Sequence, residues 1–349
     1  LTHRLRLVSY HYGRLFEHSP RLDASAGSLV FTGAESDPET LETLLRLGFK
    51  QAARAAETIR GWHFGRRSGV RTPREREVLT ELVPLLLQAF AHSGDPDAAL
   101  AGFDSALAGM PAAAELFSVL KSNPPVCELF GEILGGAPRL ARTVISRPHV
   151  LDAAIDPEVL KAPLDETAFR QRAGQVLQHK LETEEFLDAL RDFAREELFP
   201  IGLRLWSAMI EPAAAALAYS ALAASIVEAC LVHVERVFAG EHGRVAGGRS
   251  IVLALGKLGS REMTAASDLD LMLIYDFDPA RPESDGPRPL HAVPYYTRIA
   301  QRLISALTIS TRRGPLYEVD MRLRPSGGKG PLATQFTSFV DYQSKEAET

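Results

Sequence analysis

The chain has 349 residues, of which 46% are hydrophobic, and its formal net charge is −5. This composition is that of a globular protein with room for two or three domains, and its mild acidity excludes the strongly basic surface of a general nucleic-acid-binding protein. The two cysteines, Cys127 and Cys230, lack the spacing of a metal-binding or redox motif. We therefore expect two buried or free thiols in a reducing compartment.

The sequence also lacks the usual signs of a membrane or secreted protein. No uninterrupted apolar run reaches the length of a membrane span, and the first residues do not combine a charged with an apolar segment. We expect a cytoplasmic protein that binds neither membrane nor nucleic acid. The chain begins at Leu1 rather than at a methionine, which favours a fragment of a longer polypeptide.

The first long region is predicted to be helical. Residues 1–34 end in small and turn-prone residues and are interpreted as an N-terminal segment or linker. Residues 35–238 show helical patterns, and two helix starts are well marked. Asp37 and Asp95 are each followed by a proline, as expected for an N-cap residue and the first helical position.

Two further helices are predicted near the end of this region. The Ala-rich stretch 213–239 favours a helix, and its apolar residues lie nearly all round, which predicts burial between layers. The acidic residues of 181–198 are interpreted as the solvent-exposed face of an amphipathic helix.

The pattern changes at about residue 239. The short apolar runs 250–256 and 269–276 are bounded by glycine, serine and aspartate and predict strands. A helix is expected from about Val293, followed by a third strand over 315–325 in which apolar and charged residues alternate. The predicted fold class is α+β: a large helical region, then a mixed sheet with flanking helices in 239–349, incomplete at its C-terminus.

Two aspartates at the entrance of the second strand are the first candidate site residues. Asp268 and Asp270 are separated by one residue, so the period of a strand points both carboxylates to the same side. Carboxylates so close repel each other unless a cation lies between them, and oxygen ligands of this kind favour Mg²⁺. Asp320, on the charged face of the third strand, is the natural third carboxylate. Such a trio can hold two metal ions for an in-line phosphoryl or nucleotidyl transfer.

The turn before these aspartates contains Gly259 and Ser260, which fit a phosphate cradle. Each part of this set also has a simpler interpretation. An Asp–Leu–Asp sequence is often a solvated pair, a Gly–Ser pair is usually a turn, and Asp320 beside two arginines is commonly a surface charge row. The ordered combination is more specific than its parts.

This order of Gly–Ser turn, Asp–Leu–Asp strand and distal aspartate resembles the nucleotidyltransferase superfamily of the DNA polymerase beta type. The stretches "LGKLGSREMTAASDLDLMLIYD" and "YEVDMRLRPSGGKGPLAT" are similar to the two signature stretches of bacterial glutamine synthetase adenylyltransferase. That family contains two similar halves, one adenylylating and one deadenylylating. The helical stretch that begins "GDPDAALAGFDSALAGM" resembles the segment leading into the C-terminal, adenylylating half. The resemblance covers about residues 35–347.

The resemblance implies transfer of AMP from ATP to a tyrosine hydroxyl of glutamine synthetase, with release of pyrophosphate and with Mg²⁺ as cofactor. By motif position, Asp268, Asp270 and Asp320 would be the catalytic and metal-binding residues, and Asp320 would help to deprotonate the tyrosine. The ATP phosphates would be contacted by the turn residues and nearby cations, namely Gly259, Ser260, Lys257, Arg261, Arg322 and Arg324. Each of these cations could equally be an ordinary surface charge.

Two alternatives remain open at this point. The chain could be the deadenylylating half, with the same carboxylates but with phosphate as the attacking group. It could also be a non-catalytic fragment whose helical region binds a partner, which the family resemblance implies to be the PII signalling protein. The family continues beyond the position where this sequence reads "YQSKEAET", so the activity of this piece alone is a separate question.

Overall fold

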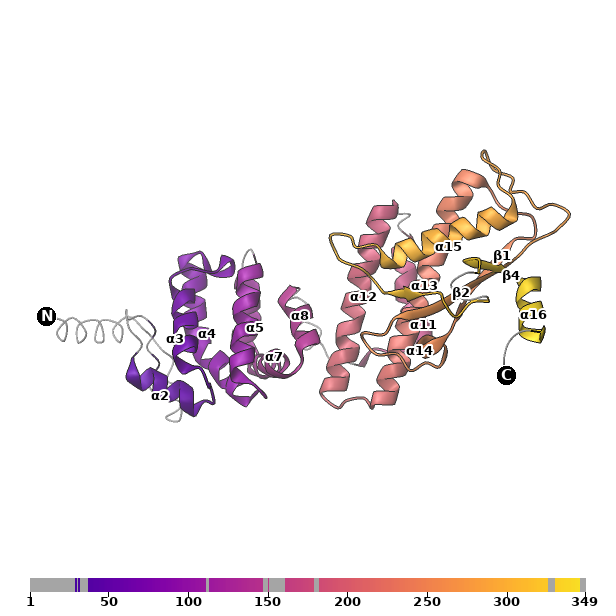
Figure 1. The fold of residues 1–349 in the computed structure, drawn as a ribbon. Coiled ribbons are helices and arrows are strands. Elements are labelled where there is room, and N and C mark those ends of the chain that lie inside the picture. Colours follow the sequence, from indigo (N-terminus) through magenta and orange to yellow (C-terminus); the bar gives the residue numbers. More distant parts are fainter. Residues whose placement is uncertain are drawn as a thin grey trace. The chain divides into compact units, whose positions relative to one another are not determined.

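The protein is described from a computed structural model, shown as a ribbon in Figure 1. The structure describes residues 37–110, 113–146, 161–178, 182–325 and 330–345, together with residues 29, 31 and 150. The chain divides into two compact units, Leu1–Leu160 and Lys161–Thr349. The first is helical where described and the second combines helices with a small mixed sheet, so the predicted α+β class is confirmed.

Short helices with marked starts make up the described part of the first unit. Thr40 N donates to the Asp37 carboxylate at 2.9 Å and Ala98 N donates to Asp95 at 3.1 Å, which confirms both predicted N-caps. The helices are α2 (Pro38–Arg46), α3 (Ala52–His63), η1 (Ser68–Val70), α4 (Pro73–His92), α5 (Pro96–Gly109), α6 (Ala114–Ser122), α7 (Pro124–Gly136) and α8 (Pro138–Ser146).

The second unit begins with three helices and continues into the sheet. Its elements are α11 (Glu166–Gln178), α12 (Thr183–Trp206), α13 (Pro212–His242), β1 (Arg249–Ala254), α14 (Gly256–Gly259), β2 (Leu269–Asp276), α15 (Ala292–Thr308), β3 (Val319–Asp320), β4 (Ala333–Gln335) and α16 (Phe336–Lys345). One hydrophobic cluster joins α11, α12, α13, the sheet and α15. The division between the units therefore falls well before residue 239, where the sequence pattern changes.

Helix α13 is the predicted buried helix, and it is confirmed. It packs against α11, α12 and α15. Its length and apolar composition would suit a membrane span, but 61% of its most apolar window is buried inside the protein, as in the core helix of a folded domain. Two of its side chains hold the sheet region. Ser220 Oγ accepts from Met263 N at 3.3 Å, and the Glu235 carboxylate accepts from Ser250 Oγ on β1.

Strand β2 lies in the centre of the sheet. It pairs antiparallel with β1, and on its other edge it pairs parallel with both β3 and β4. Its residues from Leu271 to Tyr275 are buried, which explains the continuous apolar sequence.

The expected third strand is much shorter than its alternating sequence suggested. Regular pairing covers only Val319 and Asp320, after which the chain turns. Leu323, expected on the same inward face as Met321, is 57% exposed, whereas Met321 is buried. The turn is stabilised by Arg322, which folds back to the Asp320 carboxylate, so the strand cannot continue.

Candidate active site

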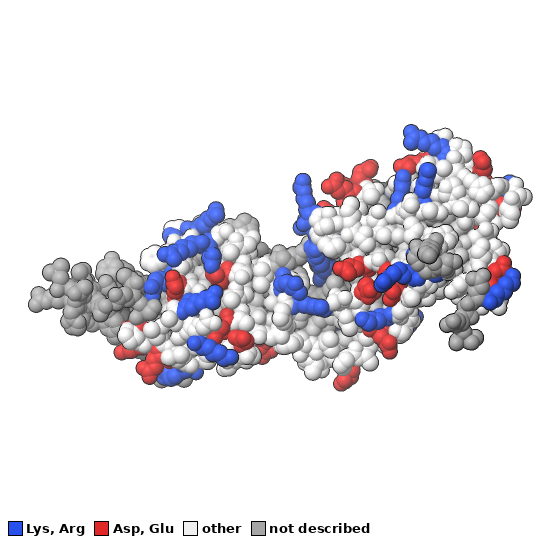
Figure 2. All heavy atoms as spheres, viewed as in Figure 1, with Lys and Arg blue, Asp and Glu red and all other residues white. Residues whose placement is uncertain are grey.

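The three predicted carboxylates lie at neighbouring positions of the sheet. Asp270 is the register partner of Asp320 in the parallel pair of β2 and β3, and Asp268 lies two residues before Asp270. The backbone fixes this arrangement, since Leu269 N donates to Glu318 O at 2.9 Å where the two strands meet. Asp268 is exposed, while Asp270 and Asp320 are half-buried. Figure 2 shows acidic atoms gathered on the second unit where β2 and β3 lie in Figure 1, with basic atoms beside them.

The turn after β1 passes directly over Asp270. Leu255 N donates to Asp270 O at 2.9 Å, and Gly256 follows with a φ of +51°. A Cβ atom on Gly256 would lie 2.1 Å from Asp270 Oδ2, so only glycine allows this approach. Gly256 was not among the predicted site residues, although it stands in the quoted signature stretch. In the structure, the Gly256 backbone lies directly against the Asp270 carboxylate and so bounds the site on that side.

The predicted cradle residues lie at the end of the same turn. A Cβ atom on Gly259 would lie 2.7 Å from Ala254 O, so this glycine lets the turn close on the end of β1. Ser260 is exposed, and its Oγ donates to Glu262 Oε2 at 3.0 Å. The hydroxyl is therefore within the turn's own hydrogen-bond network.

The charges of the site act on Asp270 and Asp320 in opposite directions. Partial burial, together with the nearby charges of Asp268 and Asp320, raises the pKa of the Asp270 carboxyl above its ordinary value. Hydrogen bonds from the Arg322 side chain and backbone lower the pKa of Asp320. Arg322 Nε lies 2.7 Å from Asp320 Oδ2 and its backbone N lies 2.8 Å from Oδ1. Asp320 is thus paired with a cation, whereas at Asp270 burial and repulsion outweigh the nearby positive charges of Arg322 and Lys257.

The four predicted cations occupy different environments. Lys257 is exposed, and its charge favours the ionised form of Asp270. Arg261 is exposed at a φ of +60°, with its guanidinium 3.8 Å from the Glu166 carboxylate on α11. Arg322 pairs with Asp320.

Arg324 differs from the other three because it is buried. Its Nε donates to Gly330 O at 3.1 Å, and its Nη1 donates to Met321 O. Arg324 therefore links two backbone segments that follow β3. Its guanidinium is used in these contacts and is not exposed to bind a phosphate.

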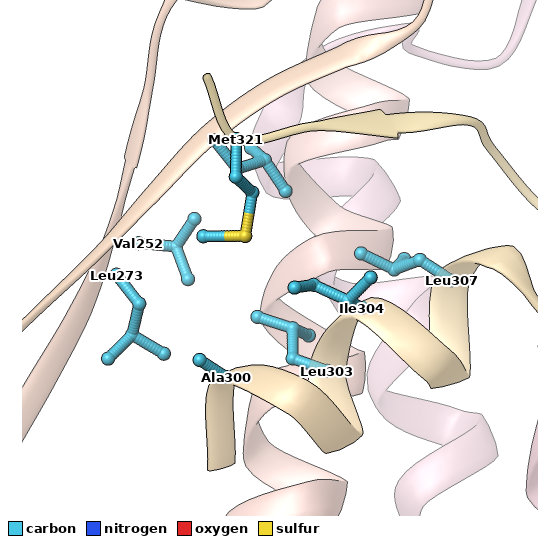
Figure 3. Close-up of a pocket in the computed structure, with 8 residues that line it drawn as sticks. Val252, Leu273, Ala300, Leu303, Ile304, Leu307 and Met321 are labelled. Carbon is cyan, nitrogen blue, oxygen red and sulfur yellow. The ribbon is translucent and has the colours of Figure 1, made fainter. Parts of the chain in front are cut away.

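The residue after Asp320 anchors β3 to the core. Met321 points into a small apolar pocket between the sheet and α15 (Figure 3). Its neighbours there include Val252 and Leu273 from the strands and Leu303 and Leu307 from α15. Because consecutive residues of a strand point to opposite sides, a buried Met321 holds Asp320 on the opposite, carboxylate-bearing side.

The donor set fits a hard divalent cation in its chemistry. Three carboxylates without nitrogen or sulfur donors are the ligands that Mg²⁺ prefers, and their mutual repulsion adds to burial in raising the pKa of Asp270. Among the described residues, however, no group of three or more His, Cys, Asp and Glu side chains is gathered closely enough to hold a metal ion. Asp320 is turned to Arg322, and this contact would have to open before the third carboxylate could join the other two.

A Gly–Ser turn, an Asp–Leu–Asp strand and a distal aspartate on the adjacent parallel strand define a nucleotidyltransferase-type module. The family model for glutamate-ammonia ligase adenylyltransferase matches residues 127–349. The chain belongs to this family.

Named relatives agree with the family match. The bifunctional glutamine synthetase adenylyltransferase/adenylyl-removing enzyme of Mesorhizobium japonicum is 49% identical over 342 residues, covering 98% of this chain and 35% of the relative. The enzymes of the same name from Agrobacterium fabrum and Brucella melitensis are each 46% identical over 345 residues, covering 99% of this chain and 35% of theirs. The chain thus spans about a third of the length of the curated relatives it matches.

Proposed function

We propose that the chain carries the adenylylating site of a glutamine synthetase adenylyltransferase and transfers AMP from ATP to a tyrosine hydroxyl of glutamine synthetase. The observation that supports this most directly is the register pairing of Asp270 with Asp320, with Asp268 at the entrance of the same strand. The turn that would receive the phosphates lies against Asp270. Substrate phosphates and carboxylates would thus meet at one end of the sheet.

In this reaction the phenolic oxygen of the tyrosine bonds to the α-phosphorus of ATP, the bond from that phosphorus to the bridging oxygen breaks, and pyrophosphate leaves. Asp268, Asp270 and Asp320 would hold two Mg²⁺ ions, which would neutralise charge on the attacking and leaving oxygens. Asp320 would accept the phenolic proton once Arg322 has released it. The contact with Arg322 lowers the pKa of Asp320, so the carboxylate is a weaker base while that contact persists.

The cations around the site have separate proposed tasks. Lys257 and Arg261 lie on the turn and would contact the ATP phosphates, as would the backbone at Gly259 and Ser260. Arg322, once free of Asp320, would pair with developing negative charge on the phosphates. The buried Arg324 would support the segment after β3 instead.

The test uses the whole polypeptide that contains this chain, incubated with labelled ATP, Mg²⁺ and glutamine synthetase. We expect label on glutamine synthetase with the unchanged protein and none with the Asp268→Asn/Asp270→Asn double variant. Asp276→Asn is the matched control, because Asp276 is exposed at the opposite end of β2. Its label should equal that of the unchanged protein.

Other outcomes would point to the two alternatives. Retained forward labelling by the double variant, with loss of its phosphate-dependent release of ADP from already adenylylated glutamine synthetase, would identify the deadenylylating half. If the double variant keeps both reactions, the chain is a regulatory module rather than a catalytic one. We also propose that the PII signalling protein binds the helical region, as the family resemblance implies; calorimetric titration of PII without any binding heat would contradict this.

A further inference from the structure

A buried arginine on α12 contacts the connection between α15 and β3. Arg191 has no exposed surface, and burial lowers the pKa of its guanidinium. Three of its hydrogen bonds reach this distant segment: Nη2 donates to Ala306 O at 3.0 Å and to Ile309 O at 2.6 Å, and Nε donates to Gly314 O at 2.6 Å. A fourth, from Nη1 to Leu187 O at 2.8 Å, fixes the side chain to its own helix.

The three distant carbonyl groups, those of Ala306, Ile309 and Gly314, belong to the end of α15 and to the turn that follows it. The last carbonyl groups of a helix have no partners within the helix and carry partial negative charge, so a guanidinium is a suitable donor for them. Gly314 lies in the tight turn in which its N donates to Thr311 O at 2.9 Å. Arg191 therefore joins the helix end and the turn, and planar guanidinium donors can do this from one buried position.

The anchored segment leads directly into the site. After the turn, the backbone N atoms of Leu316 and Tyr317 donate to Leu307 O at 3.2 and 3.1 Å, which holds the chain against the end of α15. Glu318 O then accepts from Leu269 N, and the next two residues form β3. Only six positions separate Gly314 from Asp320. β3 pairs over two residues, so its own ladder gives it little support.

We propose that Arg191 is a positioning residue for the adenylyl transfer, which places Asp320 opposite Asp270 by anchoring the segment that carries β3. Arg191 touches neither carboxylate and acts through the backbone of residues 309–318. This inference rests on the proposed function, in which Asp320 belongs to the reacting site. It assigns the placement of one catalytic carboxylate to a helix that precedes the sheet in sequence.

The first test measures hydrogen exchange in the whole polypeptide, with Arg191→Met compared with the unchanged protein. Methionine keeps an unbranched side chain of similar length but cannot donate to the carbonyl groups. We expect faster exchange in peptides covering residues 309–320, where Leu316 and Tyr317 are the informative amides, and unchanged exchange in peptides from β1. Equal acceleration throughout the second unit, or no change over 309–320, would overturn the inference.

The second test measures adenylylation kinetics. A displaced Asp320 should lower kcat roughly ten- to a hundred-fold while the KM for ATP stays within about threefold, because small misplacements of a reacting group mainly affect the chemical step. Arg191→Lys keeps a charge and some of the hydrogen bonds, so it should recover part of kcat and serves if the methionine variant folds poorly. A well-folded Arg191→Met protein with unchanged kcat would contradict the proposal.

Arg313→Gln is the matched control. Arg313 is in the same turn, but it is exposed and lies 3.5 Å from Asp192 on α12. An ion pair with one exposed and one half-buried partner at this distance contributes little, so exchange and kcat should match the unchanged protein. If the Asp268→Asn/Asp270→Asn protein still transfers AMP, the proposed function fails, whereas the exchange measurement still decides whether Arg191 anchors the segment.

Discussion

Asp270 and Asp320 are register partners in adjacent parallel strands, and their carboxylates differ in how they are neutralised. Asp320 is hydrogen-bonded to Arg322, whereas Asp270 is partly buried between negative charges. The carboxylates of Asp268 and Asp320 therefore repel that of Asp270. Packing of the two strands does not need charges at these positions. Sites that bind cations store repulsion of this kind, because the ligand removes it.

We predict that Asp270→Asn stabilises the protein at neutral pH while it abolishes adenylylation. The folded-state pKa of Asp270 is raised, so between its ordinary value of 3.8 and the folded value the native state binds more protons than the unfolded state. Stability from this group is therefore fully present below 3.8 and is lost as pH rises through the folded pKa. Thermal unfolding should show a higher Tm for the variant at pH 7, with the difference shrinking in acid.

Asp320→Asn provides the contrast for this measurement. The folded-state pKa of Asp320 is lowered, so its ionised form contributes stability above its ordinary pKa. The variant should lose stability at pH 7 rather than gain it. Equal shifts of Tm in the two variants would show that the charge environments of the two carboxylates do not differ as described.

We predict that Gly256→Ala destabilises the protein by about 1–3 kcal/mol, because alanine would be strained at a positive φ and would collide with the Asp270 carboxylate. Adenylylation should fall with it, since Asp270 must move. Gly174→Ala is the control in the same unit: Gly174 lies in α11 with open space around it, so alanine should stabilise by about 0.5–1 kcal/mol. Urea unfolding measures both, and a neutral Gly256→Ala would refute the close approach.

We predict that Met321→Ala costs about 2–4 kcal/mol in the free energy of unfolding, because it enlarges an apolar pocket that already lies beneath β3. Met321→Leu retains most of the volume and should cost less than about 1.5 kcal/mol. Denaturant unfolding of both variants checks the difference. Equal costs would mean that the side chain does not fill the pocket.

We predict that neither cysteine reacts with a thiol reagent in the native protein at neutral pH. Cys127 and Cys230 are free and buried, as the sequence predicted, and burial raises the pKa of each thiol to about 12. Both should react once the protein is unfolded in denaturant. Rapid labelling of either thiol in the native state would contradict its described burial.

The sequence was most informative where one local pattern decides the structure. The run 250–256 became β1, the helix expected from Val293 became α15, and 213–239 lies within α13. Asp320 beside the Asp–Leu–Asp strand was also predicted, because the alternation over 315–325 places it on the charged face of a neighbouring strand.

The sequence was least informative where distant residues decide the outcome. The alternation over 315–325 predicted a long strand, but Arg322 satisfies Asp320 two residues away and the chain turns instead. Arg191 stood in a stretch interpreted as an exposed acidic helix face. Its carbonyl partners beyond α12 lie 115 to 123 residues further along the chain, and no local period carries that information.

Helix α13 fixes the distance between two parts of the sheet region that it contacts. Ser220 binds the chain just after the Gly–Ser turn, and Glu235 binds the start of β1. Fifteen residues of α-helix separate the two contacts, which corresponds to about 22 Å along the axis. The helix thus sets the distance between β1 and the chain just after the Gly–Ser turn. A one-residue insertion between Ser220 and Glu235 would rotate one contact by about 100° relative to the other, so the position of the Gly–Ser turn depends on a helix that contains none of its residues.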